Sequence, residues 1–112
     1  MLERLNPEIQ DGWYQTGDIE SEYIGLTEDL FSGHFTRRGN SIILHHIYSK
    51  NPSKGNTQRF LQDCVEDGWD IVIVYPNEAM QHICKKLWLT PAEEIIADYY
   101  RGKSVTCWRR RG

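Results

Sequence analysis

The 112-residue chain carries 13 Lys and Arg against 16 Asp and Glu, a formal net charge of -3, and 39% of its residues are hydrophobic. This composition is that of an ordinary globular domain and excludes an intrinsically disordered chain, and the length favours one domain spanning residues 1–112 rather than two. The acidic balance argues against a dedicated nucleic-acid binder, because such proteins usually carry a clear excess of positive charge.

The cysteines and the hydropathy pattern indicate the environment of the chain. Cys64, Cys84 and Cys107 are an odd number at wide spacing, and no charged-then-apolar leader opens the sequence, so we expect a reducing, cytoplasmic location. No apolar run approaches the roughly 20 residues that a membrane span needs, and no membrane contact is expected. Because no C-x-x-C pair occurs, no metal site is expected either.

The N-terminal half predicts a short antiparallel meander. Residues 1–22 lack a sustained hydrophobic period and predict loop, with one short helix or strand at most. From residue 23 onward, runs of β-branched and aromatic residues alternate with turn-forming residues. The predicted strands are Tyr23–Leu26, Leu30–Thr36 and Ile42–Tyr48.

The second half predicts a β-loop-α-β unit. Residues 49–57 are rich in turn formers and lead into a helix that Gly68 ends. Trp69–Tyr75 is an almost unbroken apolar run, as expected of a strand in a parallel pair that is covered on both faces. The remaining predicted elements are a helix that opens at Pro76-Asn77 and ends before Pro91, and a hairpin of residues 94–101 and 104–110 around Gly102-Lys103.

This order of elements predicts an α/β (α+β) fold with a mixed sheet, and it resembles the core of the GNAT acyl-CoA N-acetyltransferase superfamily over about residues 22–110. The most specific element of that family is a Q/R-x-x-G-x-G/A loop that enters a helix. The corresponding stretch here is Pro52-Ser53-Lys54-Gly55-Asn56-Thr57, in which Gly55 matches. The chain therefore resembles a small and divergent member.

A second similarity lies in the helix after the buried strand. In the family this helix usually carries Asn, then Ala, then Tyr-x-x-x-Gly-Phe. Asn77 and Ala79 fit this pattern, whereas Cys84 stands at the tyrosine position and Trp88 at the glycine position. These departures concern catalysis more than fold.

The loop before the first predicted helix is the candidate binding site for acetyl-CoA. Free backbone N–H groups and the positive end of a helix dipole suit the pyrophosphate of coenzyme A, and glycine permits close approach of the backbone. The resemblance implies that the pantetheine arm lies between strands 43–48 and 70–75. A plain connection with a glycine turn stays open as an alternative. The predicted cofactor-binding residues are Ile47, Tyr48, Lys50, Lys54, Gly55, Asn56, Thr57 and Asn77.

Acyl transfer requires a base for the acceptor amine and an acid for the leaving thiolate. His45 and His46 are the candidate bases, and because adjacent strand residues face opposite ways, only one of them can point into the cleft. Ordinary packed histidines are the alternative. Cys84 is the candidate acid, with a position in the helix core as its alternative, and Tyr75 is its first substitute. Tyr99 and Tyr100 are further substitutes.

The sequence thus predicts transfer of an acetyl group from acetyl-CoA to an amine of a small molecule or protein. A catalytically inactive GNAT-like binding or regulatory module is the alternative from another class. A third and weaker interpretation is a nucleic-acid contact through Arg109–Arg111. An exposed C-terminal strand leaves a homodimer open, although charged strand edges often prevent such pairing.

Overall fold

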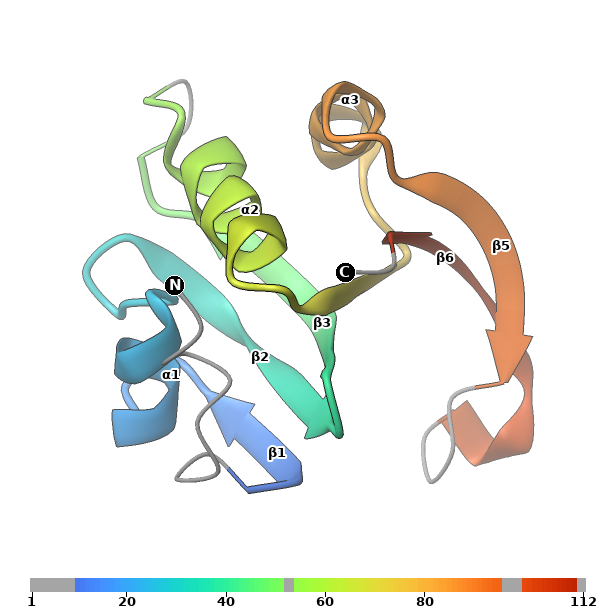
Figure 1. The fold of residues 1–112 in the computed structure, drawn as a ribbon, viewed down its shortest axis with the longest axis horizontal. Coiled ribbons are helices and arrows are strands. Elements are labelled where there is room, and N and C mark those ends of the chain that lie inside the picture. The colour runs from blue at the N-terminus through green and yellow to red at the C-terminus, as the bar shows by residue number, and fades with distance from the viewer. Residues whose placement is uncertain (1–9, 52–53, 96–99, 111–112) are drawn as a thin grey trace.

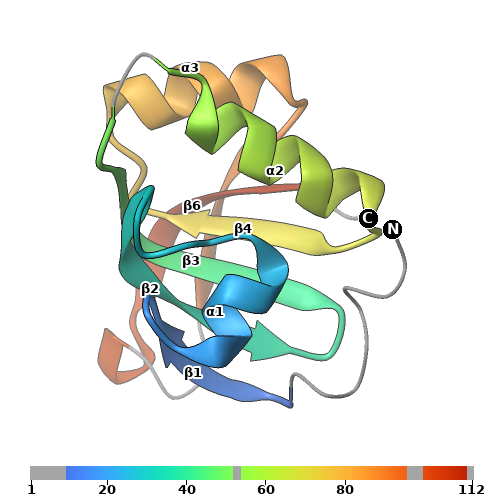
Figure 2. The ribbon, with the colours of Figure 1, turned by 90° about the vertical axis from the view of Figure 1, so that its left-hand side faces the viewer.

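The computed structural model describes residues 10–51, 54–95 and 100–110, which form one mixed, six-stranded sheet with helices packed on it (Figures 1 and 2). The predicted α+β class is confirmed. Pro52, Ser53, Tyr99 and Arg111 lie outside the described residues. The strands are β1 (Gly12–Gln15), β2 (Phe31–Arg38), β3 (Ser41–Ser49), β4 (Asp70–Val74), β5 (Thr90–Ile95) and β6 (Ser104–Arg110), and the helices are α1 (Ile19–Ile24), α2 (Asn56–Glu66) and α3 (Glu78–Lys86).

The first three strands form an antiparallel meander, but the predicted position of its first strand is wrong. That strand is β1, whereas residues 19–24 form α1. The aromatic and β-branched pair Tyr23-Ile24 resembles a strand, yet Ser21 and Ile24 are three residues apart and both fully buried, so a helix buries them on one face. Gly25 ends the helix with a φ of 96°.

Helix α2 connects β3 to β4, and these two strands are the parallel pair among the described strands. Their register runs from Ser41 opposite Asp70 to His45 opposite Val74. Both faces of β4 are buried, as the apolar run predicts. The complete sheet order is β1-β2-β3-β4-β6-β5.

Helix α3 begins and ends where the sequence predicts. The side chain of Asn77 accepts a hydrogen bond of 2.8 Å from the backbone N–H of Met80 and thereby caps the helix. At the other end, the N–H of Leu89 donates to the carbonyl of Cys84, which is the closing bond of a Schellman motif. Trp88 occupies the left-handed position of this motif with a φ of 65°.

The C-terminal hairpin pairs β5 with β6, but its first strand begins at Thr90 rather than at the predicted residue 94. Pro91 lies within β5, at the edge of the sheet, where its missing N–H leaves no bond between strands unmade. This proline both prevents the preceding helix from continuing and takes part in the strand, and the sequence pattern indicates only the first of these roles. Tyr100–Gly102 forms a short 3-10 turn before β6.

The two faces of the sheet differ. All three helices pack on one face, and the main core lies between them and the strands (Figure 2). The opposite face, here called the distal face, carries a second cluster to which none of these helices contributes. That cluster comprises Ile43, Val72, Val74, Val105 and Cys107, with Ala92 beside it. None of the helices in the described part of the chain is long and apolar enough to cross a membrane.

Candidate functional site

A β-bulge in β3 shapes the centre of the sheet. Ser32 pairs with Tyr48 and His34 pairs with His45, so that Gly33 alone lies opposite two residues of β3, His46 and Ile47. Gly33 has a φ of 135°, and a Cβ atom there would lie 2.4 Å from the carbonyl oxygen of His46. Glycine is therefore required for this close approach of the two backbones.

The bulge changes which residues of β3 face the helices. Before it, Ile42 and Leu44 belong to the core under the helices, and after it Ile47 does so. The spacing between buried positions thus changes from two residues to three. As a result, Ile47 and Ser49 line a cavity on the helix side of the sheet.

Strands β3 and β4 stop pairing at the bulge. The last parallel pair is His45 and Val74, and the next residue of each strand, His46 and Tyr75, has a positive φ of 52° and 49°. Such a conformation is uncommon for residues with bulky side chains. His46 and Tyr75 both line a small pocket of about 40 Å³ between the parted strands.

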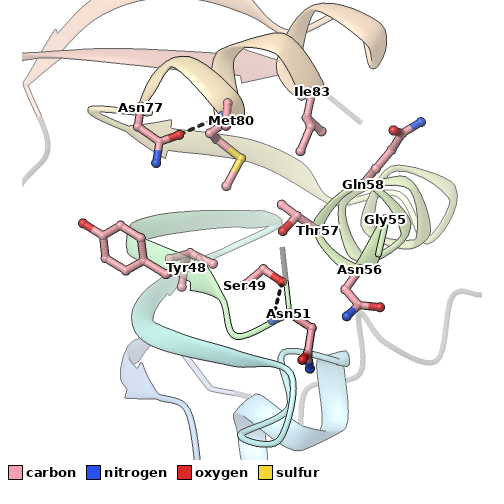
Figure 3. A pocket seen from close by; sticks show the side chains of 12 residues that line it. Tyr48, Ser49, Asn51, Gly55, Asn56, Thr57, Gln58, Asn77, Met80 and Ile83 are labelled. Carbon is pink, nitrogen blue, oxygen red and sulfur yellow. Dashed lines mark hydrogen bonds between the residues drawn. The ribbon is translucent and has the colours of Figure 1, made fainter. Parts of the chain in front are cut away.

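A larger cavity of about 410 Å³ lies between α2, α3 and the end of β3. Figure 3 shows Thr57 of α2 and Met80 and Ile83 of α3 directed toward it, whereas the ring of Tyr48 at the end of β3 points away from them. Met80, Ile47, Tyr48 and Asn77 line the smaller pocket as well, so the two hollows adjoin. The remaining residues that line the larger cavity are Ser49, Asn51, Gly55, Asn56, Gln58, Ala79 and Ile83.

The N-terminus of α2 opens at this cavity. Gly55 is the N-cap residue, with a φ of 75°, and within the described residues no side chain caps the helix. The first turn carries no acidic residue. The guanidinium of Arg59 donates hydrogen bonds to the carbonyl of Lys54 and to the side-chain oxygen of Asn56, which places a positive charge beside the loop. The geometry and the charge both suit an anion.

The structure brings together most of the predicted cofactor-binding residues. Lys50 and Lys54 are exposed and are not among the residues that line the larger cavity. The sequence pattern did not identify Arg59 at the loop as a site residue. It also did not identify Met80 and Ile83 as cavity residues, although their helical spacing indicates that they share one face of α3. The predicted residues that do line the cavity are Ile47, Tyr48, Gly55, Asn56, Thr57 and Asn77.

His45 is buried and belongs to a stack of rings on the distal face. Its Nε2 lies 3.2 Å from the hydroxyl of Thr36, and its ring stacks on that of His34 with centroids 5.1 Å apart. Burial, with smaller contributions from His34 and His46, lowers the pKa of His45 to about 4. His45 is therefore neutral at pH 7, and its adjacent histidine, His46, is the exposed one.

Cys84 lies in the core and not in either pocket. Its side chain is fully buried among the residues between α3 and the sheet, and burial raises the pKa of its thiol to about 11. This position favours the alternative interpretation, in which Cys84 is a packing residue of the helix. Tyr75, its first substitute, is exposed at the parting of the strands.

The described residues contain no group of three or more His, Cys, Asp or Glu side chains that could hold a metal ion. Comparisons of the chain with protein-family models, with curated proteins and with solved structures find no match. The functional argument therefore rests on the geometry of the cavity and on the chemistry of the residues around it.

Proposed function

We propose that the chain is an acyl-CoA-dependent N-acyltransferase with a GNAT-like fold, which transfers an acetyl group from acetyl-CoA to an amine. The observation that carries this proposal is the position of the larger cavity. It joins the uncapped N-terminus of α2 to the point where β3 and β4 part.

The two ends of the larger cavity suit two different parts of coenzyme A. The pyrophosphate lies at the N-terminus of α2, where backbone N–H groups point outward and Gly55 allows close approach. Arg59 supplies a nearby positive charge. The pantetheine arm runs along β3 beyond His45, where β3 no longer pairs with β4 and its backbone groups on that side are available.

Two further features support the resemblance to the family. Trp88 stands where the family usually has glycine, and its φ of 65° is the conformation in which glycine is favoured. Gly55, the matching residue of the loop motif, also has a positive φ, of 75°. At both positions the backbone adopts a conformation that favours glycine, which is the residue of the family pattern.

The chemistry assigns roles to the two exposed residues at the parted strands. The acceptor amine attacks the thioester carbonyl, so that a C–N bond forms and the C–S bond breaks. The imidazole of His46 takes the proton from the amine, and the phenol of Tyr75 gives a proton to the departing thiolate. His45 does not act as base, because its buried ring holds a proton only near pH 4 and below.

A binding module without transfer activity is the second candidate. It is favoured by one observation: Cys84, at the position where the family often has tyrosine, is buried in the core and cannot reach a substrate. In this case coenzyme A, if bound, serves as a ligand only.

A thermal-shift and turnover experiment separates the two candidates. Acetyl-CoA at 100 times its dissociation constant should stabilise the chain by about 2.7 kcal/mol, and release of free thiol should accompany acceptor acetylation. His46→Gln and Tyr75→Phe should each lower turnover by about 100-fold while leaving the thermal shift intact. A thermal shift without thiol release across an amine panel favours the binding module, and no shift at all contradicts the acyltransferase.

A further inference from the structure

The distal face carries a row of aromatic rings that begins at the parted strands. Trp13 of β1 and His34 of β2 have ring centroids 4.8 Å apart, and His34 stacks in turn on His45 of β3. Strand pairing places all three rings on the distal face. Trp13 lies opposite Thr36, and Thr36 lies opposite Ile43 of the distal cluster. His34 and His45 lie two residues along their strands from Thr36 and Ile43, so they share that face.

This row reaches the proposed catalytic residues through His34. The ring centroid of His34 is 5.8 Å from that of His46, which lines the small pocket together with Tyr75. The order in space is therefore Tyr75, His46, His34 and Trp13. A molecule whose amine meets His46 can lay its remaining atoms along His34 and Trp13.

The outer end of the row is open. The Trp13 side chain is 48% exposed although it stands in a sheet beside other rings, and His34 is partly exposed. On its buried side, His34 stacks on His45, which is only 1% exposed and lies within hydrogen-bond distance of the Thr36 hydroxyl. An accessible indole that is tilted against a neighbouring imidazole offers its face to another flat ring.

The charge of the row also suits an amine. Burial lowers the pKa of His34, and the nearby His46 adds to that effect, while burial lowers the pKa of His45 to about 4. The stacked imidazoles are thus neutral at pH 7 and do not repel an ammonium group. The indole face attracts cations in addition.

We propose that Trp13 and His34 form the acceptor subsite, and that the acceptor is an arylalkylamine whose aromatic ring stacks on the exposed indole of Trp13. This inference rests on the proposed acetyl transfer at the same site. It assigns the acceptor specificity to β1 and β2, whereas the cofactor occupies the helix side of the sheet.

Direct binding of two matched amines tests the inference without requiring turnover. 2-Phenylethylamine and 2-cyclohexylethylamine share the same chain and heavy-atom count, but only the first has a π face. Their dissociation constants are measured in NMR spectra from the imidazole C–H resonances of His34, which lies beside Trp13 and remains in the tryptophan variants. The aromatic amine should bind about 3- to 10-fold more tightly.

Two variants locate the effect. Trp13→Leu keeps an apolar side chain on the edge strand and should reduce the affinity ratio of the two amines to about one. Trp88→Leu removes another exposed tryptophan, which is 80% exposed on a different part of the surface, and should leave the ratio unchanged. Equal affinities of the two amines in the wild-type chain, or a preference that survives Trp13→Leu, overturns the inference.

Titration of the same samples with acetyl-CoA keeps the two proposals distinguishable. Acetyl-CoA binding without an aromatic preference overturns the acceptor subsite alone. An aromatic preference without acetyl-CoA binding overturns the proposed acetyl transfer, and with it the acceptor role, but retains Trp13 and His34 as a ring-binding site.

Discussion

His46 and Tyr75 adopt the same left-handed backbone conformation on adjacent strands, one residue after parallel pairing ends. Two bulky residues with a positive φ at matched positions store strain of order 1–3 kcal/mol each, and such strain concentrates at functional sites. Here it turns both strands apart and leaves both side chains exposed at one small pocket. The opening between β3 and β4 is thus built into the backbone.

Gly33→Ala should strongly destabilise the fold. The new Cβ would lie 2.4 Å from the carbonyl oxygen of His46, on a residue whose φ is 135°. We expect a loss of about 2–4 kcal/mol in the free energy of unfolding, measured by urea denaturation. Gly39→Ala is the matched control, since Gly39 also has a positive φ but nothing lies within 4 Å of its added Cβ, and it should cost about 1 kcal/mol. Equal losses in the two variants would contradict the bulge as described.

His45 should make the stability of the chain depend on pH. Its pKa is about 4 in the folded chain, against the ordinary histidine value of 6.5 that applies once the chain unfolds. Between these values the unfolded chain binds more protons, so the free energy of unfolding should decrease as the pH falls below about 6.5 and stop changing from this cause near pH 4. The slope from one such group is at most about 1.4 kcal/mol per pH unit.

His45→Gln isolates this contribution, because glutamine can still meet the hydroxyl of Thr36 but does not titrate. Urea denaturation between pH 7 and pH 4 should give a shallower pH dependence for the variant than for the wild-type chain. The same slope in both proteins would mean that His45 is protonated in the folded state.

Cys84→Ala should lower stability and spare activity. The thiol is fully buried, so its removal leaves a small cavity that costs about 1–2 kcal/mol in the free energy of unfolding. Turnover per folded molecule should be unchanged. Maleimide should leave Cys64, Cys84 and Cys107 unmodified in the native chain, because all three are buried, and modify them after unfolding. Rapid labelling of Cys84 in the native chain that acetyl-CoA blocks would contradict this expectation and would indicate that Cys84 lies in the binding site.

Trp88→Gly should stabilise the chain. Trp88 holds a φ of 65° while its side chain is 80% exposed, so glycine relieves backbone strain and removes little packing. We expect a gain of about 0.5–1 kcal/mol in thermal or urea denaturation. Trp88→Ala is the control, because alanine keeps the Cβ and hence the strain, and it should give no gain. A loss of stability in the glycine variant would reveal packing that the exposed position does not suggest.

The sequence predicted those parts of the fold whose signal is local. The apolar run of β4, the Asn77 cap and the glycine before α2 each identify their element directly, and the cavity accordingly gathers Gly55, Asn56 and Asn77. The signal failed at residues 23–26, where tertiary burial of Ile24 on a helix outweighs β propensity.

Other features of the site depend on pairing between distant residues. The bulge opposite Gly33 and the left-handed turn at His46 are consequences of how β2 and β3 register, which no local pattern in β3 shows. The pattern predicted that His45 and His46 face opposite ways, whereas the bulge leaves both rings beside His34, with centroid distances of 5.1 and 5.8 Å. The pattern could not establish which of them is buried.

Calorimetric titration with acetyl-CoA tests the central claim most directly. The wild-type chain should bind one equivalent, and Gly55→Val should abolish binding while remaining folded, because valine strains the φ of 75° and blocks the approach of the pyrophosphate to α2. Gly39→Val, at another positive φ with open space around it, should bind as the wild type does. No heat of binding in the wild-type chain at millimolar acetyl-CoA, or equal affinity in a folded Gly55→Val chain, would contradict the account.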